Sequence, residues 1–250
     1  MKVEKISTGS YDLNKWLFGG YERDIITMIA GSPGSGKTNF AMLAACSQAK
    51  KGNKVIFVDT EGGFSVDRVK QIVGSEEVIE KILENILILN PTNFDEQKKD
   101  FVRLLGAVKN GHVGLIVVDS MAMLYRLEIG DAIQSDSDAD KIKEINREVA
   151  KQMRALAEIS RKQNIPVIIT NQVYSEFVSE EEFKNQKERK TNIVGGDLFK
   201  YWSKCIIELK NSPGVGSVKR KAVLLKHRSM PEKEMGFVIK NEGVFKRGLF

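Results

Sequence analysis

The sequence predicts an α/β fold: a mainly parallel, twisted sheet flanked by helices, with antiparallel strands added at a C-terminal edge. Continuous apolar runs alternate with segments of helical periodicity through the first 171 residues, which is the pattern of strands joined by crossover helices. Unbroken hydrophobicity is typical of parallel strands that are buried on both faces. Beyond residue 200 the apolar runs follow one another without helix-length spacers, which indicates antiparallel strands.

The predicted parallel strands are five apolar runs, at residues 25–30, 55–59, 86–89, 115–119 and 166–171. Helices are predicted between them at residues 37–51, 64–73, 94–109 and 139–163. The last of these carries apolar residues at three- and four-residue spacing, which form one stripe: Ile142, Ile145, Val149, Met153, Leu156 and Ile159. Asn164 and Pro166 then end the helix.

The last third of the chain begins with a long polar stretch, SEFVSEEEFKNQKERKTN at residues 175–192, which is typical of a mobile loop. Three strands are predicted after it, at residues 205–210, 221–226 and 236–240. Turn residues join them, so we expect them to pair antiparallel at the sheet edge. The sequence shows no internal repeat and no domain boundary, and we expect one domain spanning residues 1–250.

Composition favours a globular protein of the cytoplasm. Hydrophobic residues make up 42% and charged residues 29% of the chain. No apolar run reaches the roughly 18 residues of a membrane span, and the N-terminus lacks the apolar core of a secretory signal. We therefore expect no membrane contact. The two cysteines, Cys46 and Cys205, lie in apolar segments, as buried thiols of a reducing compartment do.

The net charge of +6 is concentrated near the C-terminus. Residues 184–250 hold 16 Lys and Arg against 6 Asp and Glu, a net of +10, whereas residues 1–183 hold 23 against 27, a net of −4. A basic last quarter favours a surface that faces a polyanion such as DNA; a lysine-rich face exposed only to solvent is the alternative. The candidate DNA contacts are Lys184, Lys187, Arg189, Lys190, Lys219, Arg220 and Lys221.

A phosphate-binding motif follows the first predicted strand. GSPGSGKT has two glycines five residues apart followed by Lys and Thr, which is the P-loop pattern. Its glycines let backbone N–H groups converge on phosphate, and the helix N-terminus adds partial positive charge. The candidate ATP-binding residues are Gly31, Ser32, Pro33, Gly34, Ser35, Gly36, Lys37, Thr38 and Asn39. Lys37 is expected at the β- and γ-phosphates, and the Thr38 hydroxyl at Mg²⁺.

Polar residues follow other predicted strands and complete the candidate site. Asp119 ends an apolar strand, as the second magnesium carboxylate of a P-loop protein does. Glu61, two residues after Asp59, is the candidate that orients the attacking water, and Gln172 is the candidate γ-phosphate sensor. Open α/β sheets bind ligands at the carboxyl ends of their strands, so we expect these residues to converge.

The chain resembles the RecA-like recombinase family. The resemblance rests on ISTGSYDLNKWLFGGYERDIITMIAGSPGSGKT, VDTEGGFSVDRV, LIVVDS, VIITNQV and MPEKEMGFVIKNEGVF, and it extends from about Ile6 to Phe245. The P-loop alone would not distinguish P-loop families, whereas the combination of TGS, DTEG and TNQV is far more specific. Within the family, the chain is most similar to the short archaeal paralogues of the strand-exchange protein.

The resemblance implies a RecA-type P-loop core that binds Mg–ATP through Lys37, Thr38 and Asp119, with Glu61 positioning water and Gln172 linking the γ-phosphate to the loop after it. It also implies that Arg68 lies against the adenine and that residues 175–195 form the second DNA-binding loop. An arginine exposed only to solvent is an equal alternative for Arg68.

Two departures from the strand-exchange proteins bear on the implied function. TGS begins at Thr8, which leaves no room for the N-terminal helical DNA-binding domain or the polymerisation segment of those proteins. The stretch that matches their first DNA-binding loop, IGDAIQSDSDAD at residues 129–140, is acidic, and its charge would repel a duplex. We therefore expect no robust filament and no autonomous strand exchange.

What the resemblance implies is an accessory protein of recombination and repair that binds single-stranded or branched DNA, is at most a weak ATPase, and self-associates weakly if at all. The implied protein partners are the main archaeal recombinase or a Holliday-junction resolvase. A KaiC-like regulatory ATPase or autokinase is the alternative, since that family shares the core. A third hypothesis is an interaction module that ATP merely holds in shape. A metabolic P-loop kinase is disfavoured because no lid segment with several arginines is present.

A cationic cluster, Lys226, His227 and Arg228, follows a predicted C-terminal strand. In strand-exchange recombinases the matching stretch carries an acidic residue and caps the ATP of the neighbouring subunit, and in KaiC-like proteins a Lys and an Arg at this spacing reach the neighbour's γ-phosphate. We expect Lys226 and Arg228 to act across an interface, on ATP or on DNA phosphates; a solvated strand end is the alternative. A charge supplied in trans accelerates phosphoryl transfer about 10³–10⁵-fold, so a protein that rarely assembles should hydrolyse ATP slowly.

Overall fold

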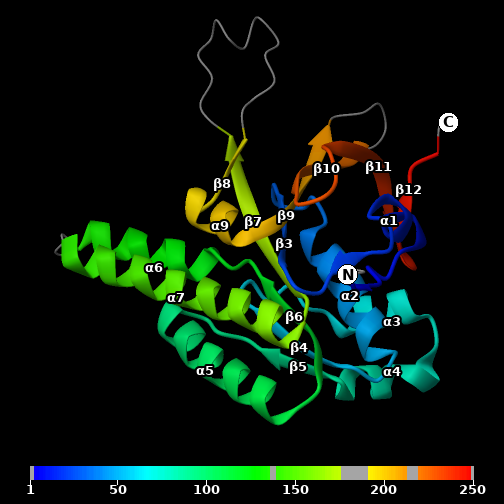
Figure 1. Cartoon of the computed structure of the whole chain (residues 1–250), viewed down its shortest axis with the longest axis horizontal. Coiled ribbons are helices and arrows are strands. Elements are labelled where there is room, and N and C mark those ends of the chain that lie inside the picture. The colour runs from blue at the N-terminus through cyan, green and yellow to red at the C-terminus, as the bar shows by residue number, and fades with distance from the viewer. Residues whose placement is uncertain (1–2, 136–138, 176–190, 213–218, 249–250) are drawn as a thin grey trace, which may run out of the picture.

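The computed structural model describes residues 3–135, 139–175, 191–212 and 219–248 (Figure 1). The predicted parallel strands are β3 (Ile26–Gly31), β4 (Lys54–Asp59), β5 (Ile86–Leu89), β6 (Val113–Asp119) and β7 (Val167–Ser175). The later strands are β9 (Ser203–Ser212), β10 (Lys219–His227), β11 (Lys233–Lys240) and β12 (Gly243–Lys246). They form one sheet in the order β12-β11-β10-β9-β3-β7-β6-β4-β5, which confirms the predicted fold class.

The C-terminal strands join the sheet beside β3. β9, β10 and β11 pair antiparallel as predicted, and β12, which was not predicted, pairs antiparallel with β11. β9 itself pairs parallel with β3. A parallel pairing needs a crossover connection, and the described part of this connection contains β8 (Thr191–Ile193), which pairs with β7, and the short helix α9 (Asp197–Trp202). The family resemblance, not the hydrophobic pattern, is what assigned these strands to a RecA-type core.

The four predicted helices are α2 (Lys37–Ala49), α3 (Val66–Val73), α5 (Phe94–Asn110) and α7 (Ala139–Gln163). Further elements were not predicted from the sequence, and most are short: β1 (Lys5–Ile6), α1 (Tyr11–Trp16), β2 (Tyr21–Glu22), α4 (Glu76–Glu84) and α6 (Met123–Gln134). None of the helices in the described ranges is both long enough and apolar enough to cross a bilayer.

The helices cover both faces of the sheet and create two apolar cores. On one face α2 packs through Phe40 and Leu43, with α3 and α4 beside it. On the other face lie α5, α6, α7 and α9, and the stripe predicted on α7 is buried there through Val149, Met153 and Leu156. Because both faces of the central strands are covered, those strands are hydrophobic throughout, as the sequence pattern indicated.

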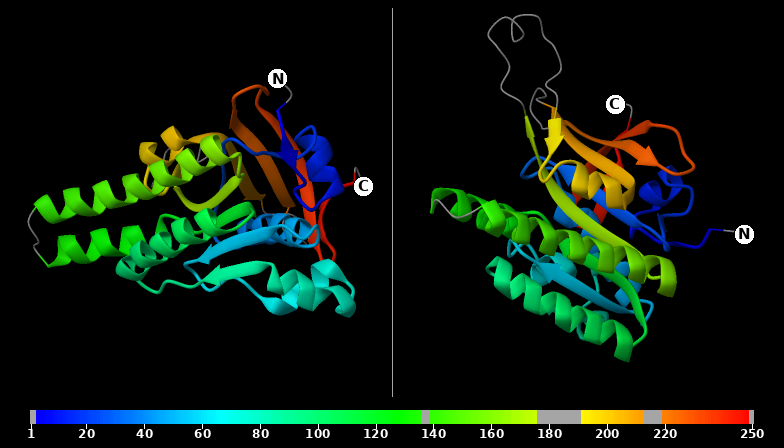
Figure 2. Two further views of the ribbon diagram at one scale, coloured as in Figure 1. Left: turned by 60° about the horizontal axis from the view of Figure 1, so that its bottom comes forward. Right: turned by 60° about the vertical axis from the view of Figure 1, so that its left-hand side comes forward.

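The acidic stretch at residues 129–140 is not the loop that the sequence analysis expected. Residues up to Gln134 belong to α6, residues from Ala139 belong to α7, and these two helices lie side by side and extend beyond the sheet (Figure 2). Asp131 is therefore on α6 and Asp140 on α7; Asp136 and Asp138 lie outside the described residues. The helix was missed because it contains Gly130 and has no clear apolar stripe, with only Leu124 and Ala132 fully covered.

Strand direction determines which loops meet at the candidate site. β3, β4, β6 and β7 are parallel, and the register sets Gly31 beside Gln172 and Asp59 beside Asp119. The carboxyl ends of these strands therefore lie at one edge of the sheet, called here the carboxyl edge. Since β10 runs antiparallel to β9, its first residues lie at the carboxyl edge, and its last residues lie at the opposite, amino edge.

We predict that truncating a leucine on α7 and a leucine on α6 will have different effects on the stability of the fold. Leu156 on α7 is fully buried, whereas Leu127 on α6 is 54% exposed. Leu156→Ala should lower the free energy of unfolding by about 2–5 kcal/mol, because it leaves a cavity in the core, while Leu127→Ala should change it by less than about 0.5 kcal/mol. Denaturant unfolding of both variants measures this, and equal losses would contradict the assigned faces.

Candidate functional site

The P-loop connects β3 to α2 through a tightly packed glycine-rich turn. Gly34 and Gly36 have positive φ angles of 71° and 105°, which favour glycine. A Cβ on Gly36 would lie 2.6 Å from the terminal methyl group of Ile239, so that side chain would have to shift. No side chain caps the N-terminus of α2, whose N-cap residue is Gly36 itself. The turn and the 13-residue helix behind it therefore form a backbone anion site of the P-loop type.

Lys37 begins α2, and its amine lies under the loop. The Nζ atom donates to the carbonyl oxygens of Gly31 and Ser32, both at 3.1 Å. Burial lowers the pKa of Lys37, while the nearby carboxylates Glu61 and Asp119 oppose that shift. The amine thus lies next to the phosphate cradle and is held by weak neutral acceptors, which an anionic ligand could replace.

Asp119, at the end of β6, links two hydroxyl groups. Thr38 Oγ1 donates to its Oδ2 at 2.7 Å, and the Thr170 hydroxyl donates to its Oδ1. Burial raises the pKa of Asp119, and these two hydrogen bonds act in the opposite direction. A carboxylate beside a threonine hydroxyl presents the oxygen ligands that Mg²⁺ prefers, and the ion normally completes its shell with phosphate oxygens and water.

The described residues contain no group of three or more His, Cys, Asp or Glu arranged to hold a metal by themselves. Magnesium here would therefore depend on a nucleotide. Thr38 and Asp119 fit that arrangement, because they supply two oxygens at the N-terminus of α2, where phosphate oxygens would supply others.

Glu61 follows the end of β4, Gln172 lies within β7, and the two side chains meet in front of the P-loop. Gln172 Nε2 donates to Glu61 Oε1 at 2.6 Å. Asp59, the neighbour of Glu61, instead accepts the backbone N–H groups of Glu61, Gly63 and Phe64 and thereby shapes the loop after β4. Glu61 is thus the carboxylate that faces the site, whereas Asp59 supports the loop.

These residues line a hollow of about 480 Å³ at the carboxyl edge. Its walls are Pro33, Gly34, Gly36, Lys37, Thr38, Asn39, Glu61, Gln172, Arg220 and Ile239. The volume is in the range of nucleotide and other small-ligand pockets. Most of the predicted ATP-binding residues are therefore brought together. Two members come from the C-terminal strands: Arg220, which the sequence analysis grouped with DNA contacts, and Ile239, which no motif singled out.

Arg68 on α3 lies beside this hollow and is held by several acceptors. Its Nε donates to Asn39 Oδ1 at 2.7 Å, and its terminal nitrogens donate to Gln71 Oε1 at 2.8 Å and to the carbonyl oxygens of Lys240 and Asn241, both at 2.9 Å. The side chain joins α3 to α2 and to the β11–β12 turn. Contact between its guanidinium face and adenine stays a prediction.

Of the basic residues predicted to contact DNA, the structure describes only those at the start of β10, and these do not share one face of the sheet. Lys184, Lys187, Arg189 and Lys190 lie outside the described residues. On β10 successive side chains point to opposite faces of the sheet, so Arg220 and Lys221 diverge. Lys221 pairs with Glu234 of β11 at 2.7 Å, whereas Arg220 lines the hollow. Lys219 is the first residue of β10.

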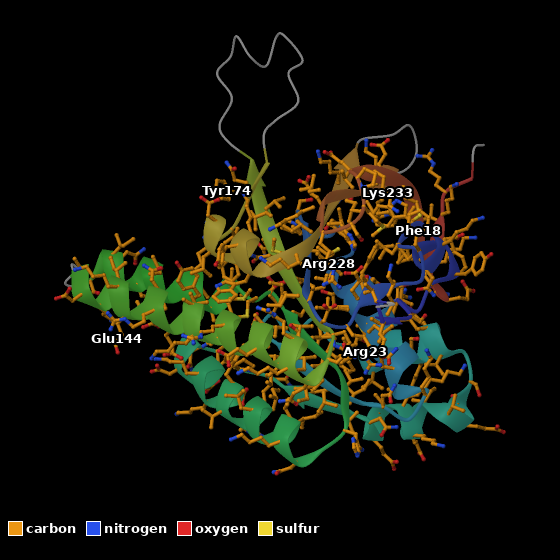
Figure 3. All side chains as sticks on the ribbon, viewed as in Figure 1. Phe18, Arg23, Glu144, Tyr174, Arg228 and Lys233 are labelled. Atoms are coloured by element: carbon orange, nitrogen blue, oxygen red, sulfur yellow. The ribbon has the colours of Figure 1, made fainter. Side chains whose placement is uncertain are left out.

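The cationic cluster lies at the amino edge. Arg228 donates to Glu22 at 2.7 Å and to both oxygens of Asp24 at 2.5 and 2.7 Å (Figure 3). Lys226 Nζ donates to the carbonyl oxygen of Lys200 at 2.7 Å. The His227 side chain is buried 3.6 Å from a Glu22 oxygen, and burial lowers its pKa, an effect that Glu22 opposes.

This placement decides what the cluster could reach. Lys226 is six residues after Arg220 along β10, a span of roughly 20 Å at about 3.4 Å per residue. Lys226 and Arg228 therefore cannot contact a nucleotide in the hollow of their own chain. Action on ATP would have to be in trans, as the sequence analysis expected, and Arg228 would first have to leave two carboxylates.

The chain is similar to known proteins of DNA recombination and repair. The Rad51 family description matches residues 1–247. A DNA repair and recombination protein RadB of Methanobrevibacter smithii is 38% identical over 243 residues, covering 96% of this chain and 95% of the relative. Proteins of the same name from Methanococcoides burtonii and Methanocaldococcus jannaschii are 39% and 38% identical, and cover 92% and 93% of this chain and 92% and 98% of the relatives.

These matches run almost from end to end in the chain and in its relatives. They confirm the resemblance that the P-loop, DTEG and TNQV motifs indicated, including the similarity to short archaeal paralogues of the strand-exchange protein. The chain belongs to the Rad51 family.

Proposed function

We propose that the chain is an ATP- and DNA-binding accessory protein of homologous recombination and DNA repair. It hydrolyses ATP weakly, does not perform strand exchange alone, and modulates the main recombinase or a Holliday-junction resolvase. The observation that carries the proposal is the convergence of Thr38, Glu61 and Gln172 in one hollow. Asp119 lies directly behind it, hydrogen-bonded to Thr38. The names of the relatives support the role in recombination over a KaiC-like regulatory function.

In the proposed site, Lys37 and the P-loop backbone hold the phosphates, and Thr38 and Asp119 hold Mg²⁺. Bound Mg–ATP would supply the γ-phosphoryl group and the metal charge that eases its transfer. Glu61 lies within hydrogen-bonding distance of Gln172, so the group that would orient water and the group that would sense the γ-phosphate are directly joined.

A substitution at Glu61 should distinguish ATP hydrolysis from ATP binding. Glu61→Gln should lower ATP turnover by about 10²-fold or more, because an amide cannot accept the proton of the attacking water, while Mg–ATP affinity should change by less than about threefold. Phosphate release and calorimetric titration measure the two quantities. Glu80→Gln on α4, an exposed site far from the hollow, is the charge-matched control.

The same variant tests the interaction-module hypothesis. If cells that carry Glu61→Gln repair damaged DNA as well as the wild type does while turnover is lost, hydrolysis is dispensable, and ATP acts only by binding. Unchanged turnover in Glu61→Gln would instead remove Glu61 from the proposed site.

DNA binding should depend on the basic residues of the polar stretch after β7. Reversing Lys187, Arg189 and Lys190 to Glu should weaken single-stranded DNA binding and make its salt dependence shallower, by about 0.7 in log–log slope for each phosphate that the variant no longer neutralises. Fluorescence anisotropy at several salt concentrations measures both. The control reverses Lys50, Lys51 and Lys54, which lie near the amino edge and carry the same charge change. Equal losses of DNA affinity in both variants would show that the effect comes from net charge and not from these three residues.

Lys226 tests the proposed action in trans. If a cation from one copy assists ATP hydrolysis in another, turnover per chain should rise with protein concentration, and Lys226→Ala should flatten that rise. Lys151→Ala on α7, where the lysine pairs with Glu148 of the same helix, should leave it intact. Turnover per chain that is constant over a hundredfold range of wild-type concentration would exclude the trans contact.

A further inference from the structure

We propose that Arg220 binds the phosphate chain of a nucleoside triphosphate held by its own chain, and that it is not a DNA contact. This inference rests on the proposed function, since it requires ATP in the hollow. It assigns to β10 the second cation of the nucleotide site, besides Lys37.

The first support is the direction of the side chain. Arg220 lies directly across from Phe237 of β11, and residues opposite each other in a ladder point to the same face. Phe237 is buried and packs edge-on against Phe40 of α2, with ring centroids 5.2 Å apart. Arg220 therefore points to the face on which α2 and its phosphate cradle lie. Lys221 points to the other face, where it pairs with Glu234.

The second support is the position of Arg220 along the strand. Gly31, the last residue of β3, is level with Leu209 of β9, which is level with Ala222 of β10. Arg220 is two residues further toward the carboxyl edge, at the height of the P-loop. Ile239 of β11 is on the same face as Phe237 and touches the loop at Gly36. Both C-terminal strands thus contribute a side chain to the wall of the hollow.

The third support is an unsatisfied donor. The Nε atom of Arg220 is buried and has no hydrogen-bond acceptor, and within the described ranges no carboxylate forms an ion pair with this guanidinium. A buried charged donor without an acceptor is costly. Glu61, the carboxylate that lines the same hollow, is bonded to Gln172 instead.

A phosphate chain supplies what this arginine lacks. The planar guanidinium offers several donors in a fork that matches phosphate oxygens. An arginine supplied in cis also stabilises the negative charge that develops during phosphoryl transfer. DNA binding fits the geometry less well, because Arg220 is half-buried and faces the hollow beside the P-loop.

The test compares Arg220→Met, Arg220→Lys and the control Lys221→Met. Calorimetric titration with Mg–ATP should show at least a tenfold loss of affinity for Arg220→Met and an intermediate loss for Arg220→Lys, which keeps the charge but not the fork. Lys221→Met should bind Mg–ATP like the wild type. Affinity of Arg220→Met for a single-stranded oligonucleotide should stay within twofold of wild type by anisotropy.

Stability without nucleotide separates binding from a structural role. Methionine keeps most of the side-chain volume and removes the unpaired donor, so Arg220→Met should melt at the wild-type temperature or above it in the absence of nucleotide. The rise in melting temperature on adding Mg–ATP should shrink in this variant. If Arg220→Met does not fold, the same comparison is made with Arg220→Lys.

Two outcomes would overturn the inference: wild-type Mg–ATP affinity in Arg220→Met, or abolished oligonucleotide binding with nucleotide affinity intact. Failure of the proposed function gives a different result. In that case the wild type would bind Mg–ATP no better than Lys37→Ala, which removes the P-loop amine, and both proposals would fall.

Discussion

The carboxyl edge of the sheet is organised around one buried carboxylate, Asp119. It is 1% exposed and accepts hydrogen bonds from the hydroxyl groups of Thr38 and Thr170, while the Thr60 hydroxyl donates to its backbone carbonyl. These threonines belong to the start of α2, to β7 and to the loop after β4. Because a buried carboxylate is costly unless hydrogen bonds satisfy it, the three elements must meet at the end of β6, and this meeting positions the P-loop against Glu61 and Gln172.

The cationic side chains around the sheet differ in the hydrogen-bond acceptors that the chain provides for them. Lys37 is held by carbonyl oxygens of its own loop, and Arg228 is neutralised by Glu22 and Asp24. Arg68 has backbone and amide acceptors. The buried Nε atom of Arg220 has no acceptor among the residues that the structure describes. A cation that has its acceptors within the chain supports the fold, whereas one that lacks them in a hollow is available to a ligand.

Sequence patterns predicted the features that are set by neighbouring residues in the chain. They did not predict the features that are set by the pairing register of the strands. The P-loop, the strand-end residue Asp119 and the stripe on α7 follow from local spacing and lie where expected. Gln172 was expected after a strand but lies within β7, which continues to Ser175. The face of the sheet on which Arg220 lies could not be predicted from local spacing. Ala222, Val223 and Leu224 are all buried, so their hydrophobicity does not show which alternate residues of β10 point toward α2. Helix α6 was missed because only Leu124 and Ala132 of its residues are fully buried, which leaves no clear apolar stripe.

β10 runs from the carboxyl edge of the sheet to the amino edge. A second copy of the chain could therefore bind at either of two different surfaces. Any head-to-tail contact would bring the amino edge of one chain to the hollow of the next, a heterologous arrangement that need not close. The sequence offered three cations there, but the structure commits Arg228 to two carboxylates and buries His227 under conditions that lower its pKa. Of the three, only Lys226 is held by nothing stronger than a carbonyl oxygen. One ammonium group gains less from a neighbour's phosphates than three cations would, so weak self-association is the physical expectation for this chain.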